Sequence, residues 1–139
     1  MKNTLQALCL ILVVNLPLFA QDSGYGLEDT EHLLDGYSFN YQYQSGRAIH
    51  ILFKDGELTY QWIAGANAGN PIKTLPYQSR KIDDSIYLVN WHEPLEENFI
   101  TLVINLKNRI VASSVIVKYG RENPVIAFEG GIIEHVNRE

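Results

Sequence analysis

Apolar and polar residues alternate along most of the chain after residue 37, in short runs that turn residues separate. In the first run, Phe39, Tyr41 and Tyr43 share one side, while amide and hydroxyl side chains occupy the other. A period of two is typical of a strand with one buried face. The predicted strands span residues 38–44, 47–53, 57–63, 74–82, 85–93, 98–105, 109–118 and 125–136.

The turns between these runs join each strand to the next one. Lys54-Asp55-Gly56 is the strongest hairpin signal, because glycine accepts a positive φ at little cost. About eight strands in sequence, with almost no helix, predict an all-β, antiparallel up-and-down barrel whose interior can hold a small ligand. A two-sheet sandwich is the alternative. In the last strand, we expect Gly130-Gly131 to form a bulge or bend.

The start of the chain has the pattern of a signal peptide. Residues 1–20 contain Lys2 as their only charge, then an apolar run from Leu5 to Ala20, before the sequence turns polar. We therefore expect a cleaved leader and an exported protein, periplasmic or secreted. Retention as a membrane anchor is the weaker alternative, because Asn15 and Pro17 interrupt the run and a spanning helix needs about 20 apolar residues.

Two further segments follow the leader. Residues 21–36 predict a flexible segment with a short helical turn that ends at Gly36. Residues 37–139 predict the barrel domain. No later apolar run is long enough to cross a membrane, so we expect no membrane contact once the leader is removed.

The composition narrows the chemistry and the partners. The single cysteine, Cys9, lies within the leader, so the domain has no disulfide and no thiolate nucleophile. A formal net charge of −5 without a basic cluster argues against nucleic acid. We expect no metal and no cofactor, since His92 faces away from its neighbour Glu93 on an extended strand and cannot share an ion with it.

The alternation also brings a carboxyl and two phenols together. Glu93 lies on the same side of its strand as Trp91, and both this side and that of Tyr41 and Tyr43 should face the barrel interior. Burial would raise the pKa of Glu93 and make it a proton donor or base near neutral pH. The alternative is that the two tyrosines are ordinary core aromatics and that Glu93 begins a loop.

Four motifs carry a family resemblance. Together they resemble the phenolic acid decarboxylases and the related MoaF-type domains, in order from about Gly36 to Gly131. The resemblance implies a lipocalin-like (calycin) barrel, with the smaller MoaF-type domains as the closer relatives. The motifs are Phe39-Asn-Tyr41-Gln-Tyr43-Gln-Ser-Gly46, Leu58-Thr-Tyr60-Gln-Trp62-Ile-Ala-Gly65, Ile86-Tyr87-Leu-Val-Asn-Trp91-His-Glu93-Pro94 and Asn123-Pro124-Val-Ile-Ala-Phe128.

The resemblance also implies residue roles. In the decarboxylases a tyrosine pair orients the substrate carboxylate and a glutamate transfers protons, without a cofactor. The matching catalytic candidates are Tyr41, Tyr43 and Glu93. The family carries an arginine in the loop after the third strand, where this chain has Asn70. A substrate carboxylate then loses a charge-assisted bond worth about 1.5–3 kcal/mol, unless Arg47 or Arg80 replaces it.

Three functions remain open. The first is an exported MoaF-like barrel that binds a small aromatic or flat organic molecule. The second is a cofactor-free lyase that uses Glu93 as acid and base. The third is a protein-interaction module with a filled core. A homodimer is also open, although no exposed apolar strand in the sequence marks a dimer face. The expected ligand-contacting residues, besides the catalytic candidates, are Tyr60, Trp62, Asn70 and Trp91.

Overall fold

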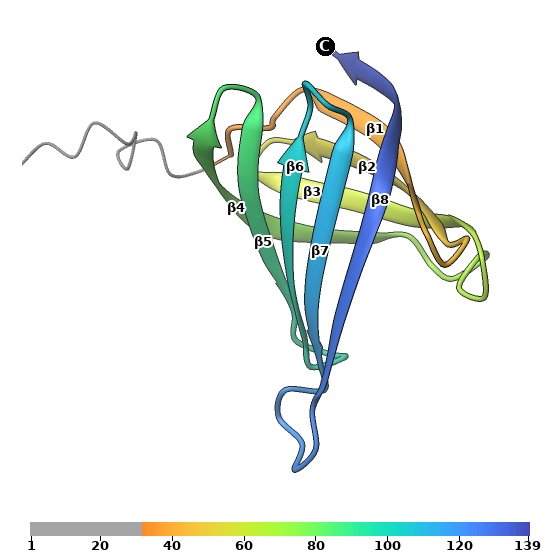
Figure 1. Cartoon of the computed structure of the whole chain (residues 1–139). Coiled ribbons are helices and arrows are strands. Elements are labelled where there is room, and N and C mark those ends of the chain that lie inside the picture. The colour runs from red at the N-terminus through yellow and green to blue at the C-terminus, as the bar shows by residue number, and fades with distance from the viewer. Residues whose placement is uncertain (1–31) are drawn as a thin grey trace, which may run out of the picture.

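The computed structural model describes residues 32–139, which form a closed antiparallel barrel. Each strand pairs with the next, and β8 pairs with β1 (Figure 1). The predicted up-and-down barrel is therefore confirmed, and the sandwich is not formed. The predicted leader and most of the predicted flexible segment lie outside the described residues. The strands are β1 (Tyr37–Tyr43), β2 (Ala48–Lys54), β3 (Glu57–Ala64), β4 (Lys73–Asp83), β5 (Ile86–Glu93), β6 (Asn98–Asn105), β7 (Ile110–Val117) and β8 (Val125–Arg138).

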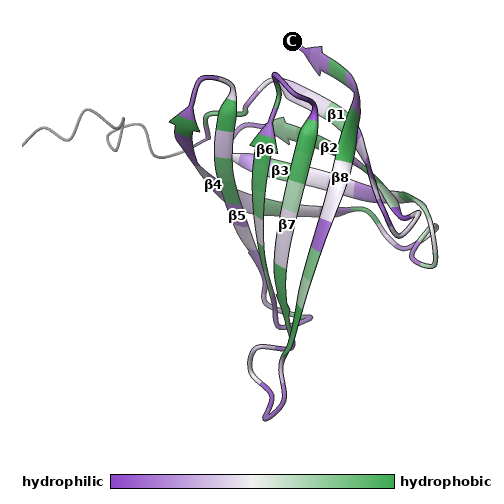
Figure 2. Ribbon diagram, viewed as in Figure 1, coloured by the Kyte–Doolittle hydropathy of each residue, from purple (hydrophilic) through white to green (hydrophobic). Residues whose placement is uncertain are grey.

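The strands form two groups that cross each other. In Figure 1, β1 to β4 run across the barrel behind β5 to β8, which converge toward the loop between β7 and β8. The β1–β2 turn and the loop after β3 lie together at one side of the molecule. Figure 2 shows hydrophobic residues along β5 to β8 and hydrophilic residues at many of the turns. Residues 32–139 contain no helix that is long and apolar enough to cross a membrane.

Alternation places the predicted inner faces inside the barrel. Phe39, Tyr41 and Tyr43 on β1 are all buried, as are Trp91 and Glu93 at the end of β5. The prediction for the last strand is wrong in one respect, because β8 continues through Gly130-Gly131 and both glycines keep their register with β7. The irregularity lies instead where β8 meets β1, near His135, whose φ is 50°.

Gly131 is required by a close approach of β8 to its neighbours. A Cβ at this position would lie 2.8 Å from the carbonyl oxygen of Gln42 and 3.0 Å from Cγ1 of Val111. At the adjacent Gly130, a Cβ would meet nothing within 4 Å. The two glycines thus have different roles, although they stand side by side in the sequence.

The variant Gly131→Ala should lower the free energy of unfolding by about 1–3 kcal/mol, because overpacking against backbone forces strands apart. The matched variant Gly130→Ala should be neutral, or stabilising by up to about 1 kcal/mol, because alanine restricts the unfolded chain more than glycine does. Urea unfolding followed by tryptophan fluorescence measures both. Equal effects of the two variants would contradict this assignment.

One end of the barrel is closed by the segment before β1. Residues Leu33–Gly36 form a hydrogen-bonded turn, in which Tyr37 N donates to the Leu34 carbonyl at 2.9 Å, and no helix is formed within the described residues. The expected helical turn is therefore wrong for residues 33–36. The side chain of Leu34 is fully buried in the core. Asp35 holds the turn in place, since its carboxylate accepts hydrogen bonds from Tyr77 Oη at 2.8 Å and Gly56 N at 3.0 Å.

Candidate functional site

A cavity of about 560 Å³ occupies the other end of the barrel. Its wall is formed by the ends of β1, β3 and β5, the starts of β4 and β6, the loop after β3, and parts of β7 and β8. The structure brings every residue predicted for the site into this lining. These residues are Tyr41, Tyr43, Tyr60, Trp62, Asn70, Trp91 and Glu93.

Glu93 is the centre of a hydrogen-bond network inside the cavity. It is the last residue of β5 and only 3% exposed. Its Oε1 accepts hydrogen bonds from Tyr60 Oη at 2.5 Å and from Trp91 Nε1 at 3.3 Å. Its Oε2 accepts from Lys73 Nζ at 2.9 Å and Asn98 Nδ2 at 3.1 Å. Four donors, one each on β3, β4, β5 and β6, therefore hold one buried carboxylate.

These contacts decide the charge of Glu93. Burial alone would raise its pKa, but the hydrogen bonds from Tyr60, Lys73 and Asn98, with the charge of Lys73, outweigh burial and lower the pKa below the usual value of 4.5. The expectation of a raised pKa is therefore wrong. Glu93 is ionised at neutral pH, so it can accept a proton or a hydrogen bond but does not carry a proton to donate.

Lys73 is the functional group that the sequence reasoning missed. Its Nζ lies 2.9 Å from Glu93 Oε2 and 2.9 Å from Glu96 Oε1. The alternation of β4 could have revealed it, because Lys73 lies on the same side as the buried Tyr77, four residues later. The sequence predicts that this strand begins at Thr74, whereas β4 begins one residue earlier, at Lys73. Asn98 was also missed, although the predicted strand begins at this residue and alternation places it on the same side as the buried Ile100.

Arg47 lies at the cavity and Arg80 does not. The guanidinium of Arg47 forms an ion pair with Glu129 on β8. It also lies 5.7 Å from the ring centre of Tyr43 and 5.5 Å from that of Trp62, where cation–π attraction adds to the ion pair. Arg80 is exposed on the outer face of β4, so it cannot replace the missing family arginine.

The loop after β3 is packed closely on Arg47. Gly65 has a φ of 89°, and a Cβ there would lie 2.7 Å from Cγ of Arg47. Only glycine meets both conditions. The same loop brings Asn70 into the cavity wall, and residues 65–72 contain no lysine or arginine. The loop therefore supplies an amide where the decarboxylases have a cation.

The two tyrosines of β1 form the neutral part of the cavity. The rings of Tyr41 and Tyr43 meet edge to face, with centres 5.2 Å apart. Burial, and then the neighbouring Tyr43, raises the pKa of Tyr41 well above its ordinary value. Burial also raises the pKa of Tyr43, against the opposing hydrogen bond of Ser113. Both phenols stay protonated at neutral pH and can donate hydrogen bonds to a ligand.

Known structures support the fold but not a function. The chain is similar to the solved structure described as "Crystal Structure of a putative beta-lactamase from Burkholderia vietnamiensis", with a TM-score of 0.65 and 12% identity. The match covers 73% of this chain and 94% of that one. At this identity the likeness shows the fold alone. No curated protein matches the chain.

The sequence match to a family model is more informative than the structural likeness. The model described as MoaF-like matches residues 35–131, which include seven complete strands and part of β8. This range contains every candidate residue of the cavity. The chain belongs to the MoaF-like family.

Proposed function

We propose that this protein is an exported binding barrel whose cavity takes a small, planar, aromatic molecule that carries no negative charge. The observation that carries the proposal is that each cation lining the cavity is already paired with a carboxylate. The leader pattern of residues 1–20 supports export.

The charges of the cavity disfavour an anionic ligand. Among the described residues, the lining contains two cations, Arg47 and Lys73, and three carboxylates, those of Glu93, Glu96 and Glu129. Arg47 is neutralised by Glu129, and Lys73 lies between the other two carboxylates. A ligand carboxylate would have to displace one of these pairs or enter a site with excess negative charge. Both cost free energy, because like charges repel strongly where water is excluded.

Size and lining favour a flat, largely apolar molecule. A volume of about 560 Å³ lies within the usual range of small-molecule sites, roughly 300–1,000 Å³. Trp62 and Trp91 offer aromatic surfaces, and Tyr41, Tyr43 and Asn70 offer uncharged hydrogen-bonding groups. The presence of this cavity argues against the alternative of a protein-interaction module with a completely filled core.

Decarboxylation is the less well supported alternative. A decarboxylase must anchor the carboxylate of its substrate. This chain has Asn70 where the phenolic acid decarboxylases carry an arginine. Lys73 and Arg47 cannot take this role without leaving a buried or half-buried carboxylate unpaired, which is typically costly. Glu93 is also ionised, so it lacks the proton that an acid catalyst would give to the product.

The test compares two ligands that differ in charge but hardly in shape, p-coumaramide and p-coumarate. Both tryptophans of the chain line the cavity, so intrinsic fluorescence reports binding directly. At neutral pH the amide should bind at least about tenfold more tightly than the carboxylate, equivalent to about 1.4 kcal/mol. A preference for p-coumarate would contradict the proposal.

The variant Glu129→Gln is the matched control for the charge argument. It keeps the size of the side chain but leaves Arg47 without its carboxylate partner. The ratio of the two affinities should then move toward p-coumarate by about tenfold, because a free guanidinium is a strong partner for a carboxylate. An unchanged ratio would mean that the pairing of Arg47 does not govern selectivity.

The same samples distinguish binding from catalysis. We expect no loss of the conjugated-acid absorbance of p-coumarate with the native protein. Turnover that disappears in Glu93→Gln would instead establish the lyase, and would show that Asn70 is no obstacle to decarboxylation.

A further inference from the structure

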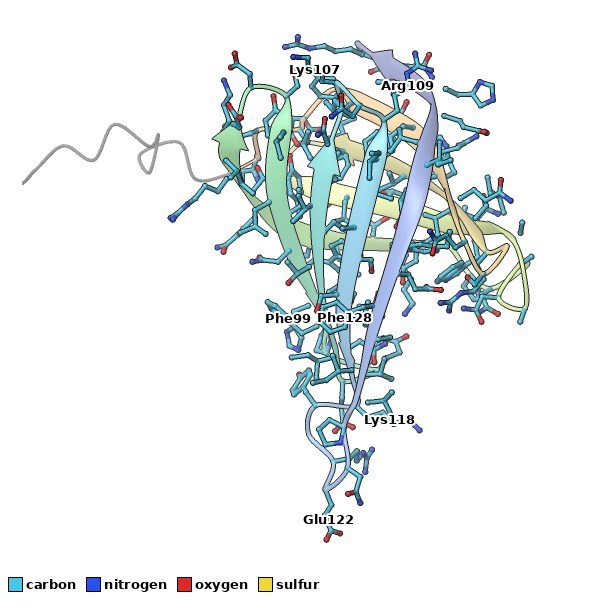
Figure 3. The ribbon with its side chains drawn as sticks, in the orientation of Figure 1. Phe99, Lys107, Arg109, Lys118, Glu122 and Phe128 are labelled. Carbon is cyan, nitrogen blue, oxygen red and sulfur yellow. The ribbon has the colours of Figure 1, made fainter. Side chains whose placement is uncertain are left out.

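The outer face of β5 to β8 carries large apolar side chains that the barrel itself does not cover. Phe128 is 76% exposed, Ile132 64% and Ile126 62%, and Phe99 and Ile110 are also exposed. The strand registers place these residues on one continuous face, since Phe99 pairs with Ile116, Ile116 with Ile126, and Ile110 with Ile132. Phe99 and Phe128 lie in neighbouring rows of this face, two strands apart, and Figure 3 labels both on the β6–β8 side of the barrel. This face was not recognised from the sequence.

We call this face the outer sheet surface. It consists of the outward positions in four rows across β5, β6, β7 and β8, and contains no lysine, arginine, aspartate or glutamate. Labelled charged residues lie beyond its two ends, with Lys107 and Arg109 at one end and Lys118 and Glu122 at the other (Figure 3). Its members are His92, Phe99, Ile116 and Ile126; Asn90, Thr101, Ser114 and Phe128; Leu88, Val103, Ala112 and Gly130; Ile86, Asn105, Ile110 and Ile132.

The absence of charge is the first sign of an interface. Ordinary outer faces of antiparallel sheets are polar, and exposed apolar patches of this size mark contact sites. Depletion of charged residues with enrichment of aromatic ones is also the composition of interface centres. The outer sheet surface has both properties, whereas the outer face of β4 carries Arg80 and Gln78.

Gly130 is the second and independent sign. Its φ is not in the left-handed region, and a side chain there would meet nothing within 4 Å, so nothing in this chain requires glycine. Together with Ala112 beside it, Gly130 forms a shallow strip next to the large side chain of Phe128. When the fold of the chain does not require a glycine within a strand, the glycine typically marks a place where another surface approaches closely.

We propose that the outer sheet surface is the interface of a twofold homodimer. A bulky residue beside a shallow strip on one face is what a self-complementary contact requires, because each Phe128 can fill the strip of the other copy. Four strands at a spacing of about 4.8 Å and four rows of residue pairs give roughly 500 Å² per copy, or about 1,000 Å² in total. This area reaches the lower limit of about 1,000 Å² for a specific interface.

The experiment measures the mass of the purified protein by sedimentation equilibrium between about 1 and 100 µM. The key variant is Gly130→Arg, because the structure leaves open space at this position and the barrel should therefore fold normally. Phe128→Glu is the second variant. Ile63→Arg is the matched control, since Ile63 is also an exposed apolar residue but lies on β3, which pairs with β2 and β4 and with no strand of the outer sheet surface. Thermal unfolding of all four proteins verifies that each one is folded.

We expect a native dimer that Ile63→Arg preserves, and whose dissociation constant Gly130→Arg and Phe128→Glu raise at least tenfold. A native protein that stays monomeric at about 100 µM would overturn the proposal, as would a dimer that neither variant weakens. If the monomeric protein binds phosphatidylcholine vesicles through Phe128, the surface faces lipid and the dimer proposal is wrong.

Discussion

The variant Glu93→Ala is expected to lower the free energy of unfolding by about 3–5 kcal/mol, since each buried donor left without an acceptor costs about 1–3 kcal/mol. Four donors would lose their common acceptor: Tyr60 Oη, Trp91 Nε1, Lys73 Nζ and Asn98 Nδ2. Urea unfolding at pH 7, followed by circular dichroism, measures the loss. A change below about 1 kcal/mol would show that water replaces the carboxylate at no cost.

The pH dependence provides a separate check on Glu93. Its pKa in the folded protein lies below the ordinary 4.5, so its contribution to stability is complete above that value and disappears as the pH falls through the folded pKa. Native stability should therefore fall more steeply below about pH 4.5 than the stability of Glu93→Gln does. Parallel curves for the two proteins would contradict a lowered pKa.

The variant Leu34→Ala should destabilise the barrel by about 2–5 kcal/mol, because it opens a void in the closed end. Leu34 is fully buried, although it precedes the first strand. The matched control is Leu95→Ala, since Leu95 is 94% exposed in the turn after β5 and should change the stability by less than about 0.5 kcal/mol. Similar effects at both positions would mean that the segment before β1 does not close the barrel.

The strands of the first half could be predicted because their two faces differ chemically. In β1, aromatic side chains alternate with serine, asparagine and glutamine, and only one register buries the aromatics. The turn at Asp55-Gly56 then sets the pairing of β2 with β3, and both residues have positive φ there. The burial of Tyr41, Tyr43 and Glu93 follows from the same alternation.

The second half was harder to predict because its strands are apolar on both faces. In β7, Val111 faces the core while Ile110 and Ile116 face outward, and nothing in the sequence distinguishes these side chains. Such a run predicts a strand but not an exposed apolar surface. The outer sheet surface becomes visible only when the registers of β6, β7 and β8 are known.

The charge state of the cavity could not be predicted for a different reason. The pKa of Glu93 depends on how near Lys73 and Asn98 lie, and these residues are 20 and 5 positions away in the sequence. Burial alone predicted an upward shift, whereas the hydrogen bonds reverse it. A pattern of alternation gives the side of a strand on which a residue lies but not the distances between residues on different strands.

The pairing of β1 with β8 also has a consequence for the order in which the chain can fold. Tyr37 lies opposite Arg138, so the ring of strands closes between residues from the two ends of the domain. The entropy of ordering the intervening chain must be overcome before this last pairing contributes any stability. The barrel therefore cannot be completed before β8 has been synthesised. Closure must wait until the final strand has been synthesised, which leaves a time during which β1 is without one of its neighbours.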